Sequence, residues 1–466
     1  MSAAGGANRS LVLAEEITGA GALTARDHTQ LQRLLLDHLG CAWRGANLPW
    51  GATLRAWAAP QAGSGRAALF ASGLETTPST AAFVNATAAH GLELDDTHDE
   101  SVSHPGAPVI ATALAVGRQH GATLGEVLAA IAAGYEVTGR VGAATNAARA
   151  IERGFHPTAL FAGFGATATA GRLLGLDARG LARAWGLMLS MAGGSMQFSQ
   201  EAAGTTVKRL HGGYAALHGV LAAEHAALGI AGPEQALDGR YGLIANFGED
   251  GDPARLVEPH RDGPEIHRVS FKPYPCCRLF HSTLDALAEV TDGFALDPER
   301  IARLRVGGPE ILVTQHMLRR PESEMAAQYA LPWTLGAALV FGPTSVDGFM
   351  AEQLGDARIA ALAARVEAEL SPEMEAAFPR HFGSWLELET TDGERRRAEV
   401  LDSLGTPARP MDDAALVAKF DGLVAPTALA LDGATLLGML RGADPEQPID
   451  TLIAPFAGAA DREENA

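Results

Sequence analysis

The sequence predicts a mainly α protein with a large all-helical domain and a smaller α/β (α+β) domain. The chain has 466 residues, which is too long for one ordinary hydrophobic core at roughly 150 residues per domain. Hydrophobic residues make up 47% of it and are mostly Ala and Leu, which favour helices. Strand-like alternation of apolar and polar residues is confined to one later part of the chain. We therefore expect two domains of unequal size.

The helical domain is predicted over residues 1–268, with residues 405–466 returning to it. Thr123 and Glu126 have the spacing of a capping box that opens an apolar helix, and Asp177 stands where a cap follows a Leu-Gly helix stop. Small residues fill segments such as AAFVNATAAHG and LAAIAAGYEVTG, and they let helices approach one another closely. After the proline-rich stretch GTPARPMDD the helical pattern resumes.

The smaller domain is predicted over residues 269–404. The segments IARLRVGG and SWLELETTDGERRRAEV alternate apolar and polar residues as strands do. Asp392 and Gly393 lie between two such runs and are typical of a hairpin turn.

The charge of the chain restricts its partners. The 36 basic and 55 acidic residues give a formal net charge of −19, which repels polyanions and argues against nucleic-acid binding. An anionic substrate would need a local cluster of cations. Only three lysines occur, against 33 arginines (36 minus 3), and burial can bring a lysine pKa into a useful range. The retained lysines Lys208, Lys272 and Lys419 therefore suggest chemistry, although an arginine-rich composition alone is the alternative.

The sequence favours a cytoplasmic protein without a membrane span. Only three cysteines occur, and the adjacent Cys276 and Cys277 are poorly placed to pair with each other. Glu15 and Glu16 interrupt the stretch where a signal peptide would be apolar. The uncharged run over residues 325–346 contains too many polar residues and prolines for a span, so we interpret it as buried core.

The first candidate site is the segment AAHGLELDDTHDESVSHPGAP, residues 88–108. If a helix from Thr80 continues to Thr97, then His90, Glu93 and Thr97 share one face. The alternative is a metal site, whose ligands would be His98, His104, Asp95, Asp96 and Asp99. Their spacing matches no metal motif, so we expect no metal. For Asp99 and Glu100 we prefer a solvated helix end.

Two further segments add a base and cations. His156 in GFHPTALFAG precedes a proline at an expected helix start, where the helix dipole favours neutral imidazole; a capping histidine without chemistry is the alternative. Lys208, Arg209 and His211 cluster in GTTVKRLHGG and would suit a carboxylate. The two glycines leave room for a ligand or a neighbouring helix, and their order does not fit a phosphate loop. We expect no cofactor.

The segment FKPYPCCRLFH, residues 271–281, lies at the predicted domain boundary. Lys272 and Arg278 flank its prolines and would present cations to a cleft. A nucleophilic cysteine here has no supporting catalytic motif, and buried inert thiols are commoner.

These segments, in this order, resemble the 2-methylcitrate dehydratase (MmgE/PrpD) superfamily, which includes cis-aconitate decarboxylase and iminodisuccinate epimerase. The resemblance covers most of the chain and also includes PESEMAAQYALPW and GTPARPMDD. It implies a helical body, a smaller α/β lid, a homodimer, and an active site between body and lid. The positions matching the family's active-site pattern are Glu93, Thr97, His104, His156, Lys208 and Lys272. Lys419 falls in a family-like segment and is interpreted as structural.

The sequence departs from the decarboxylase pattern at four positions. Glu93 stands in place of an aspartate, His104 is offset by one residue, Cys277 replaces a histidine, and Trp333 aligns with a tyrosine. The loss of the last two polar groups argues against decarboxylation of cis-aconitate but favours no particular alternative. Dehydration of a 2-methylcitrate-like hydroxy acid is our first expectation. Epimerisation of an imino- or amino-dicarboxylate is the alternative, and cis-aconitate decarboxylation or carboxylate binding without catalysis comes after it.

The expected mechanism removes a proton next to a carboxylate of a small polycarboxylate. Such a step needs a base and cations where negative charge develops. We assign catalytic roles to Glu93, His104, His156, Lys208 and Lys272, with His156 or His104 as the base and Glu93 orienting a histidine. Substrate contacts are assigned to Thr97, His90, Arg209, Cys277 and Arg278.

Overall fold

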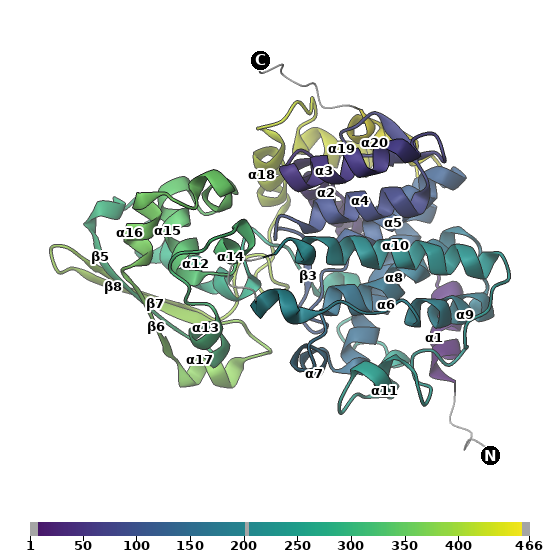
Figure 1. Ribbon diagram of the computed structural model, residues 1–466, viewed down its shortest axis with the longest axis horizontal. Helices are drawn as coiled ribbons and strands as arrows, with labels where there is room; N and C mark the ends of the chain where they lie inside the picture. Colours follow the sequence, from purple (N-terminus) through teal and green to yellow (C-terminus); the bar gives the residue numbers. More distant parts are fainter. Residues whose placement is uncertain (1–7, 201–204, 459–466) are drawn as a thin grey trace.

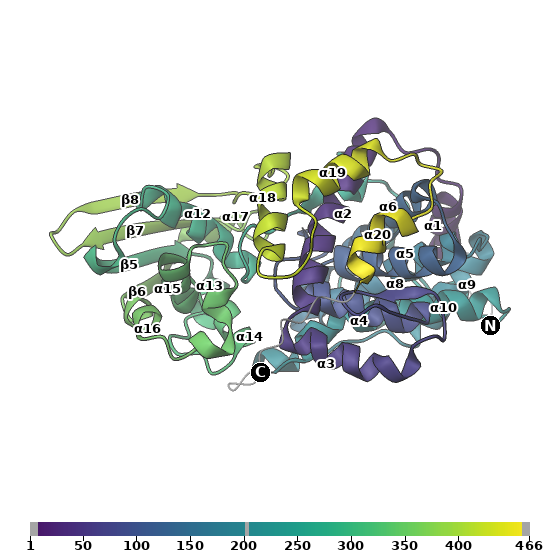
Figure 2. The same cartoon turned by 90° about the horizontal axis from the view of Figure 1, so that it is seen from above.

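The structure is a computed structural model that describes residues 8–200 and 205–458. Figures 1 and 2 show two lobes side by side along the long axis of the molecule, a larger helical lobe and a smaller lobe that contains the main sheet. The predicted fold class, mainly α with a smaller strand-containing domain, is confirmed.

The helical lobe combines the first half of the chain with its last helices. Its helices from the first half are α1 (Arg9–Thr18), α2 (Ala25–Ala46), α3 (Pro49–Ala58), α4 (Pro78–His90), α5 (Gly106–His120), α6 (Leu124–Thr145), α7 (Ala147–Glu152), α8 (Pro157–Leu173), α9 (Ala178–Leu189), α10 (Val207–Ala227) and α11 (Leu243–Phe247). Its last helices are α18 (Asp413–Val424), α19 (Gly433–Gly442) and α20 (Asp450–Ala457). The side chains of α18 and α19 join the hydrophobic core around α2, which returns the C-terminal part of the chain to this lobe.

Local sequence signals set several helix starts as predicted. Thr123 caps α6 and forms the full capping box with Glu126, and Asp177 caps α9. The paired glycines of the HGG segment make room for a neighbouring helix: a Cβ at Gly213 would lie 2.1 Å from the Thr87 hydroxyl oxygen of α4. Helices α4 and α10 therefore pack at a distance that only glycine permits there.

The smaller lobe is built on a four-stranded sheet in the order β6-β5-β7-β8. Its strands are β5 (Ile301–Gly308), β6 (Val366–Leu370), β7 (Ser384–Thr390) and β8 (Arg395–Val400). β5 runs parallel to β6 and antiparallel to β7, and β7 and β8 form the predicted hairpin, in which Gly393 has a φ of 88°. The helices of this lobe are α12 (His281–Val290), α13 (Glu310–Gln315), α14 (Glu324–Gln328), α15 (Leu331–Phe341), α16 (Ala357–Ala363) and α17 (Pro372–Ala377).

Two short strand pairs lie outside this sheet, β1 (Ala67–Leu69) with β2 (Leu74–Thr76), and β3 (Thr97–His98) with β4 (Val269–Ser270). The apolar run over residues 325–346 contributes α15, whose residues 331–338 are buried. No helix within residues 8–200 and 205–458 is both long and apolar enough to cross a membrane. The domain boundaries at residues 268/269 and 404/405 stay a prediction.

Candidate active site

The chain turns sharply after α4 instead of continuing as a helix. Glu93 has a φ of 56°, a left-handed conformation that a right-handed helix cannot contain. The expectation of one helical face from Thr80 to Thr97 is therefore wrong, because α4 ends at His90 and Thr97 lies in β3. The turn nevertheless buries His90, Glu93 and Asp95, each with no more than 2% of its surface exposed.

Three donors from different parts of the chain hold the Glu93 side chain. Lys208 Nζ, in the first turn of α10, donates to Glu93 Oε1. Lys272 Nζ lies 3.0 Å from the Glu93 carbonyl oxygen and 3.3 Å from Oε2, and the Tyr329 hydroxyl donates to Oε2 at 3.2 Å. Both lysines are almost completely buried, and this burial lowers the pKa of each amine. We had expected Glu93 to orient a histidine, but its hydrogen-bond partners among the described residues are the two lysines and Tyr329.

The pairing of β3 with β4 explains how Lys272 reaches this cluster. Thr97 of β3 lies opposite Ser270 of β4 in an antiparallel ladder. Lys272 follows two residues later, so the ladder places its amine beside the turn that carries Glu93.

Four histidine rings lie beside these charged groups. His90 Nδ1 lies 2.6 Å from Asp95 Oδ2. The centroid of the His90 ring lies 5.1 Å from that of His104 and 6.2 Å from that of His156, and the His156 and His211 centroids are 4.5 Å apart. The rings come from the end of α4, the loop before α5, the N-cap of α8 and the first turns of α10. Tertiary packing therefore brings four histidines from distant parts of the sequence into one cluster.

Three of these rings have a buried nitrogen that has no hydrogen-bond partner among the described residues. They are His90 Nε2, His156 Nδ1 and His211 Nδ1. Burial holds the pKa of His90 and of His156 well below its usual range, and it lowers the pKa of His211 to about 4. Neutral imidazole nitrogens can accept a proton or donate a hydrogen bond, so the three free positions suit a polar ligand.

His104 and Thr97 lie next to each other at the edge of this group. His104 Nδ1 is 2.8 Å from the Asp96 carbonyl oxygen and 3.4 Å from the Thr97 hydroxyl oxygen. Burial lowers the pKa of His104 to about 3. The backbone N–H of His104 donates to the Thr158 hydroxyl of α8 at 3.1 Å, which ties this loop to the helix that carries His156.

Cys277 is buried at the end of the FKPYPCC segment. Its backbone N–H donates to the Gln328 carbonyl oxygen at 2.9 Å. Burial raises the pKa of its thiol, which keeps the sulfur protonated and a poor nucleophile. This agrees with the inert thiol that the sequence favours.

Each of the two predicted substrate-binding arginines forms an ion pair with an acidic side chain. Arg209 pairs with Glu324 of α14 at 2.6 Å, and its guanidinium lies 3.8 Å from the centroid of the Trp50 ring. Arg278 donates to the Ser403 hydroxyl at 3.0 Å and lies 3.5 Å from Asp99 Oδ2. These contacts link segments distant in sequence, and the substrate-binding role of both arginines stays a prediction.

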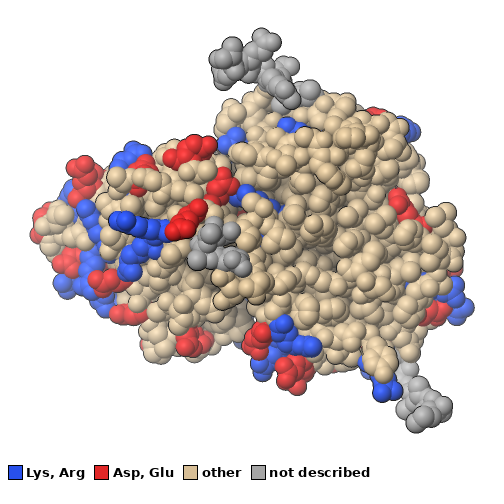
Figure 3. All heavy atoms as spheres, viewed as in Figure 1, with Lys and Arg blue, Asp and Glu red and all other residues tan. Residues whose placement is uncertain are grey.

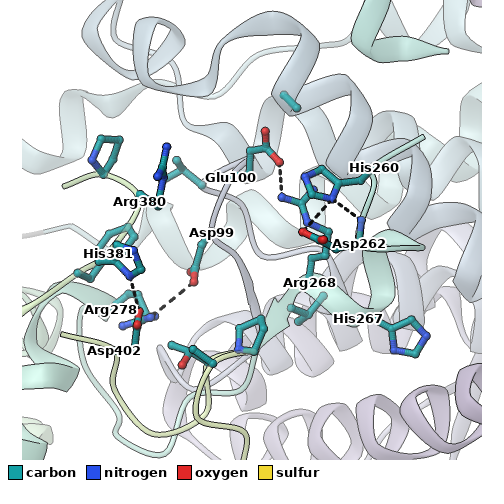
Figure 4. A pocket seen from close by; sticks show the side chains of 18 of the residues that line it. Asp99, Glu100, His260, Asp262, His267, Arg268, Arg278, Arg380, His381 and Asp402 are labelled. Carbon is teal, nitrogen blue, oxygen red and sulfur yellow. Dashed lines mark hydrogen bonds and ion pairs between the residues drawn. The ribbon is translucent and has the colours of Figure 1, made fainter. Parts of the chain in front are cut away.

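Arg278 and Asp99 line an open cleft of about 1460 Å³, drawn in Figure 4. Glu100 on this cleft pairs with Arg268 at 2.6 Å. The interpretation of Asp99 and Glu100 as a solvated helix end is therefore wrong, because both carboxylates form ion pairs and no helix is present there. The cleft's described lining includes neither Lys208 nor any of the four clustered histidines, so the open cleft and the buried cluster are separate features.

A metal ion has one candidate position within residues 8–200 and 205–458. His90, Asp95 and His104 each offer a ligand atom, all within 4.8 Å of one another. The Nδ1 atoms of both histidines and Asp95 Oδ2 already form hydrogen bonds, so the three residues would offer a metal the Nε2 atoms of the histidines and Asp95 Oδ1. His98, which belonged to the metal alternative, has its two ring nitrogens bound to other side chains at 2.9 and 2.7 Å.

Sequence reasoning missed Tyr329. Trp333, which aligns with a family tyrosine, is buried and donates its indole N–H to the Gly348 carbonyl oxygen at 3.0 Å. Tyr329 stands four residues earlier and supplies the hydroxyl that reaches Glu93. A tyrosine one helical turn from the aligned position was the available signal.

Comparison with known families now places the chain. The family model for the MmgE/PrpD N-terminal domain matches residues 20–256, and that for the MmgE/PrpD C-terminal domain matches residues 274–430. The chain belongs to the MmgE/PrpD family. The family predicted from the sequence is confirmed.

Several curated relatives are cis-aconitate decarboxylases. The mouse protein is 30% identical over 65% of this chain and 62% of its own length, so this chain spans less than two thirds of that relative. The human protein is 28% identical over 76% of this chain and 74% of its own length. The protein from Aspergillus terreus is 26% identical over 66% of each chain.

Proposed function

We propose that this MmgE/PrpD protein is a lyase that removes the proton next to a carboxylate of a small polycarboxylate. The observation that carries the proposal is the convergence of free, neutral imidazole nitrogens with two buried lysine amines. Removal of such a proton places negative charge on the adjacent carboxylate, and preorganised cations stabilise that charge strongly in a site without water.

The Glu93 side chain marks where a substrate carboxylate would bind. Lys208, Lys272 and Tyr329 all donate to this one residue. A substrate carboxylate offers the same acceptor oxygens and can replace it between the amines. A second carboxylate or hydroxyl could then meet the free nitrogens of His156 and His211. Two anchoring points favour a substrate with at least two carboxylates.

Our first choice of reaction is dehydration of a 2-methylcitrate-like hydroxy acid. Loss of the β-hydroxyl from the carbanion-like intermediate completes the elimination. Decarboxylation of a cis-aconitate-like tricarboxylate is the second candidate, and the similarity to cis-aconitate decarboxylases favours it. Epimerisation of an imino- or amino-dicarboxylate uses the same first step but returns the proton to the other face.

Proton NMR in deuterated water distinguishes these reactions. The purified protein is incubated with 2-methylcitrate, citrate, cis-aconitate and amino-dicarboxylates, and Lys208→Gln, purified in the same way, controls for contaminating enzymes. New vinyl signals with retention of every carboxyl carbon support dehydration, and vinyl signals with release of CO2 establish decarboxylation. Deuterium incorporation without vinyl signals moves the assignment to an epimerase. Equal turnover by Lys208→Gln contradicts the proposal.

We further propose that the protein forms a homodimer through the uncharged face over α3, α4 and α10. Figure 3 shows few charged side chains on this part of the helical lobe. A row of aromatic rings crosses it: Trp57 lies 5.6 Å from Phe83, and Phe83 lies 5.4 Å from Tyr214. Trp57 is 52% exposed and Tyr214 38% exposed, in a chain of net charge −19. Exposed apolar patches of this kind are typical of interfaces.

Light scattering coupled to size-exclusion chromatography tests the dimer. Tyr214→Glu should convert it to a monomer, because the substitution buries a charge at the interface. Tyr241→Glu is the matched control, since Tyr241 is 70% exposed outside this row. A monomeric wild type contradicts the proposal.

A further inference from the structure

Asp95 and His90 form a buried carboxylate–imidazole pair. His90 Nδ1 lies 2.6 Å from Asp95 Oδ2, with 0% of His90 and 2% of Asp95 exposed. An ionised carboxylate only accepts hydrogen bonds, so the proton between these atoms belongs to Nδ1. This fixes the tautomer of the ring and leaves the lone pair on Nε2.

The Nε2 atom of His90 has no hydrogen-bond partner among the described residues, although it is buried. An orphaned buried nitrogen costs stability unless water or a ligand satisfies it, so a polar ligand beside His90 Nε2 would gain a hydrogen bond there. The absence of a side chain at Gly212 of α10 makes room for the His90 ring. A Cβ at Gly212 would lie 3.1 Å from His90 Cβ, so glycine on α10 gives the imidazole its space.

The groups around His90 keep it neutral and put cations near the reaction. The groups that face it are Lys208 and His211 of α10, Lys272 after β4, His104 in the loop before α5, and His156 at the N-cap of α8. Burial, with the charge of Lys208 as the second cause, lowers the pKa of His90. A neutral imidazole with an oriented tautomer beside two amines meets the requirements of a general base.

We propose that His90 is the general base of the reaction and that Asp95 is its positioning residue. This inference rests on the proposed function and replaces the assignment of the base to His104 or His156. His104 Nδ1 bonds a backbone carbonyl oxygen, and His156 has no carboxylate partner among the described residues. Neither ring is therefore hydrogen-bonded to a carboxylate that would stabilise its protonated form as Asp95 does for His90.

The step balances with the groups present. His90 Nε2 takes the proton from the carbon next to a substrate carboxylate, and the C–H electron pair forms an enediolate facing the amines. The electrons then form the carbon–carbon double bond as the β C–O bond breaks. The leaving hydroxyl takes the proton from His90 Nε2 and departs as water, which regenerates neutral His90.

His90→Asn is the principal test. The asparagine amide can still donate to Asp95, while the Nε2 position is lost. We expect kcat to fall by about 10³-fold, in the middle of the range for general acid–base catalysis. Binding of tricarballylate, a tricarboxylate without the leaving hydroxyl, should stay within about twofold of wild type by calorimetry, because the lysines bind it.

Two further variants test the positioning residue and control for the loss of a buried histidine, Asp95→Asn and His38→Asn. Asp95→Asn should lower kcat but not tricarballylate affinity, since it removes the carboxylate that fixes the tautomer. His38 of α2 is also a buried histidine with an unpartnered Nε2 and lies outside the cluster, so His38→Asn should keep wild-type kcat. A lower kcat in His90→Asn than in His38→Asn would show that the loss of activity comes from removing the base and not from removing a buried ring.

Two results overturn the role of His90. One is a His90→Asn kcat within about tenfold of wild type, which is less than general-base catalysis contributes. The other is a loss of tricarballylate affinity that accounts for the whole loss of activity, which would make His90 a binding residue. If wild type instead fails to turn over or exchange any polycarboxylate, the proposed function itself is wrong.

Discussion

Replacement of Lys208 by methionine tests the charge balance of the candidate site. Lys208 is 0% exposed and donates to Glu93, which is 1% exposed. Methionine has nearly the same length and no charge, so it removes the amine without opening a large cavity. The variant leaves a buried carboxylate with one fewer partner.

The expected cost follows from the contacts that remain. Removing one partner of a buried ion pair costs about 3–5 kcal/mol. Glu93 keeps Lys272 and Tyr329 as donors, so we expect the lower end, about 3 kcal/mol. With an unfolding entropy of about 2.1 cal/mol/K per residue, a chain of 466 residues would lose about 3 °C in Tm if it unfolds as one unit.

Differential scanning calorimetry measures the stability of the two single variants and of the double variant, which together form a double-mutant cycle. Glu93→Gln alone should also destabilise the protein, because it leaves two buried amines without their carboxylate. The double variant Glu93→Gln/Lys208→Met removes both charges and should cost about 2 kcal/mol less than the two single costs combined. Additive costs would refute the reasoning, since they would mean that the two side chains do not interact.

Three further predictions concern chemistry and pH. Lys272→Arg keeps the charge but changes the donor geometry, so kcat should fall by more than about tenfold; near-normal turnover would leave Lys272 only an electrostatic role. Activity should survive exhaustive chelation, and a loss restored by added metal ions would contradict this. Burial lowers the pKa of His38 to about 3 from 6.5, so the stability from this neutral group is complete above about pH 6.5 and is lost as the pH falls toward 3. Urea titrations give the free energy of unfolding at each pH between 4 and 6. The slope of this free energy against pH should be smaller in His38→Asn than in wild type, by up to about 1.4 kcal/mol per pH unit, and an unchanged slope would contradict the assignment.

The parts of the fold that depend on neighbouring residues could be predicted from the sequence. Thr123 and Asp177 cap the helices that they were expected to cap, and the hairpin turns at Gly393. Caps and tight turns involve residues a few positions apart, so their chemistry can be recognised in a short window. The rarity of lysine also drew attention to Lys208 and Lys272, both of which are buried beside Glu93.

The errors arose where distant contacts override local preference. The segment after His90 has enough helical pattern to continue, but Glu93 takes a left-handed turn and directs its side chain to two lysines. The sequence also cannot say which carboxylate a guanidinium pairs with. Arg209 meets Glu324, 115 residues away.

The sequence by itself determined the helix-rich composition, the separate strand-forming region, the family, and the small set of lysines and histidines able to do chemistry. Only the tertiary structure decided which of them meet. It brings His90, His156 and His211 together from three helices, pairs His90 with Asp95, and adds Tyr329 from the smaller lobe. The physical reason is that local spacing fixes caps, turns and periodic faces, whereas the packing of helices and the pairing of β3 with β4 fix which side chains share one buried site.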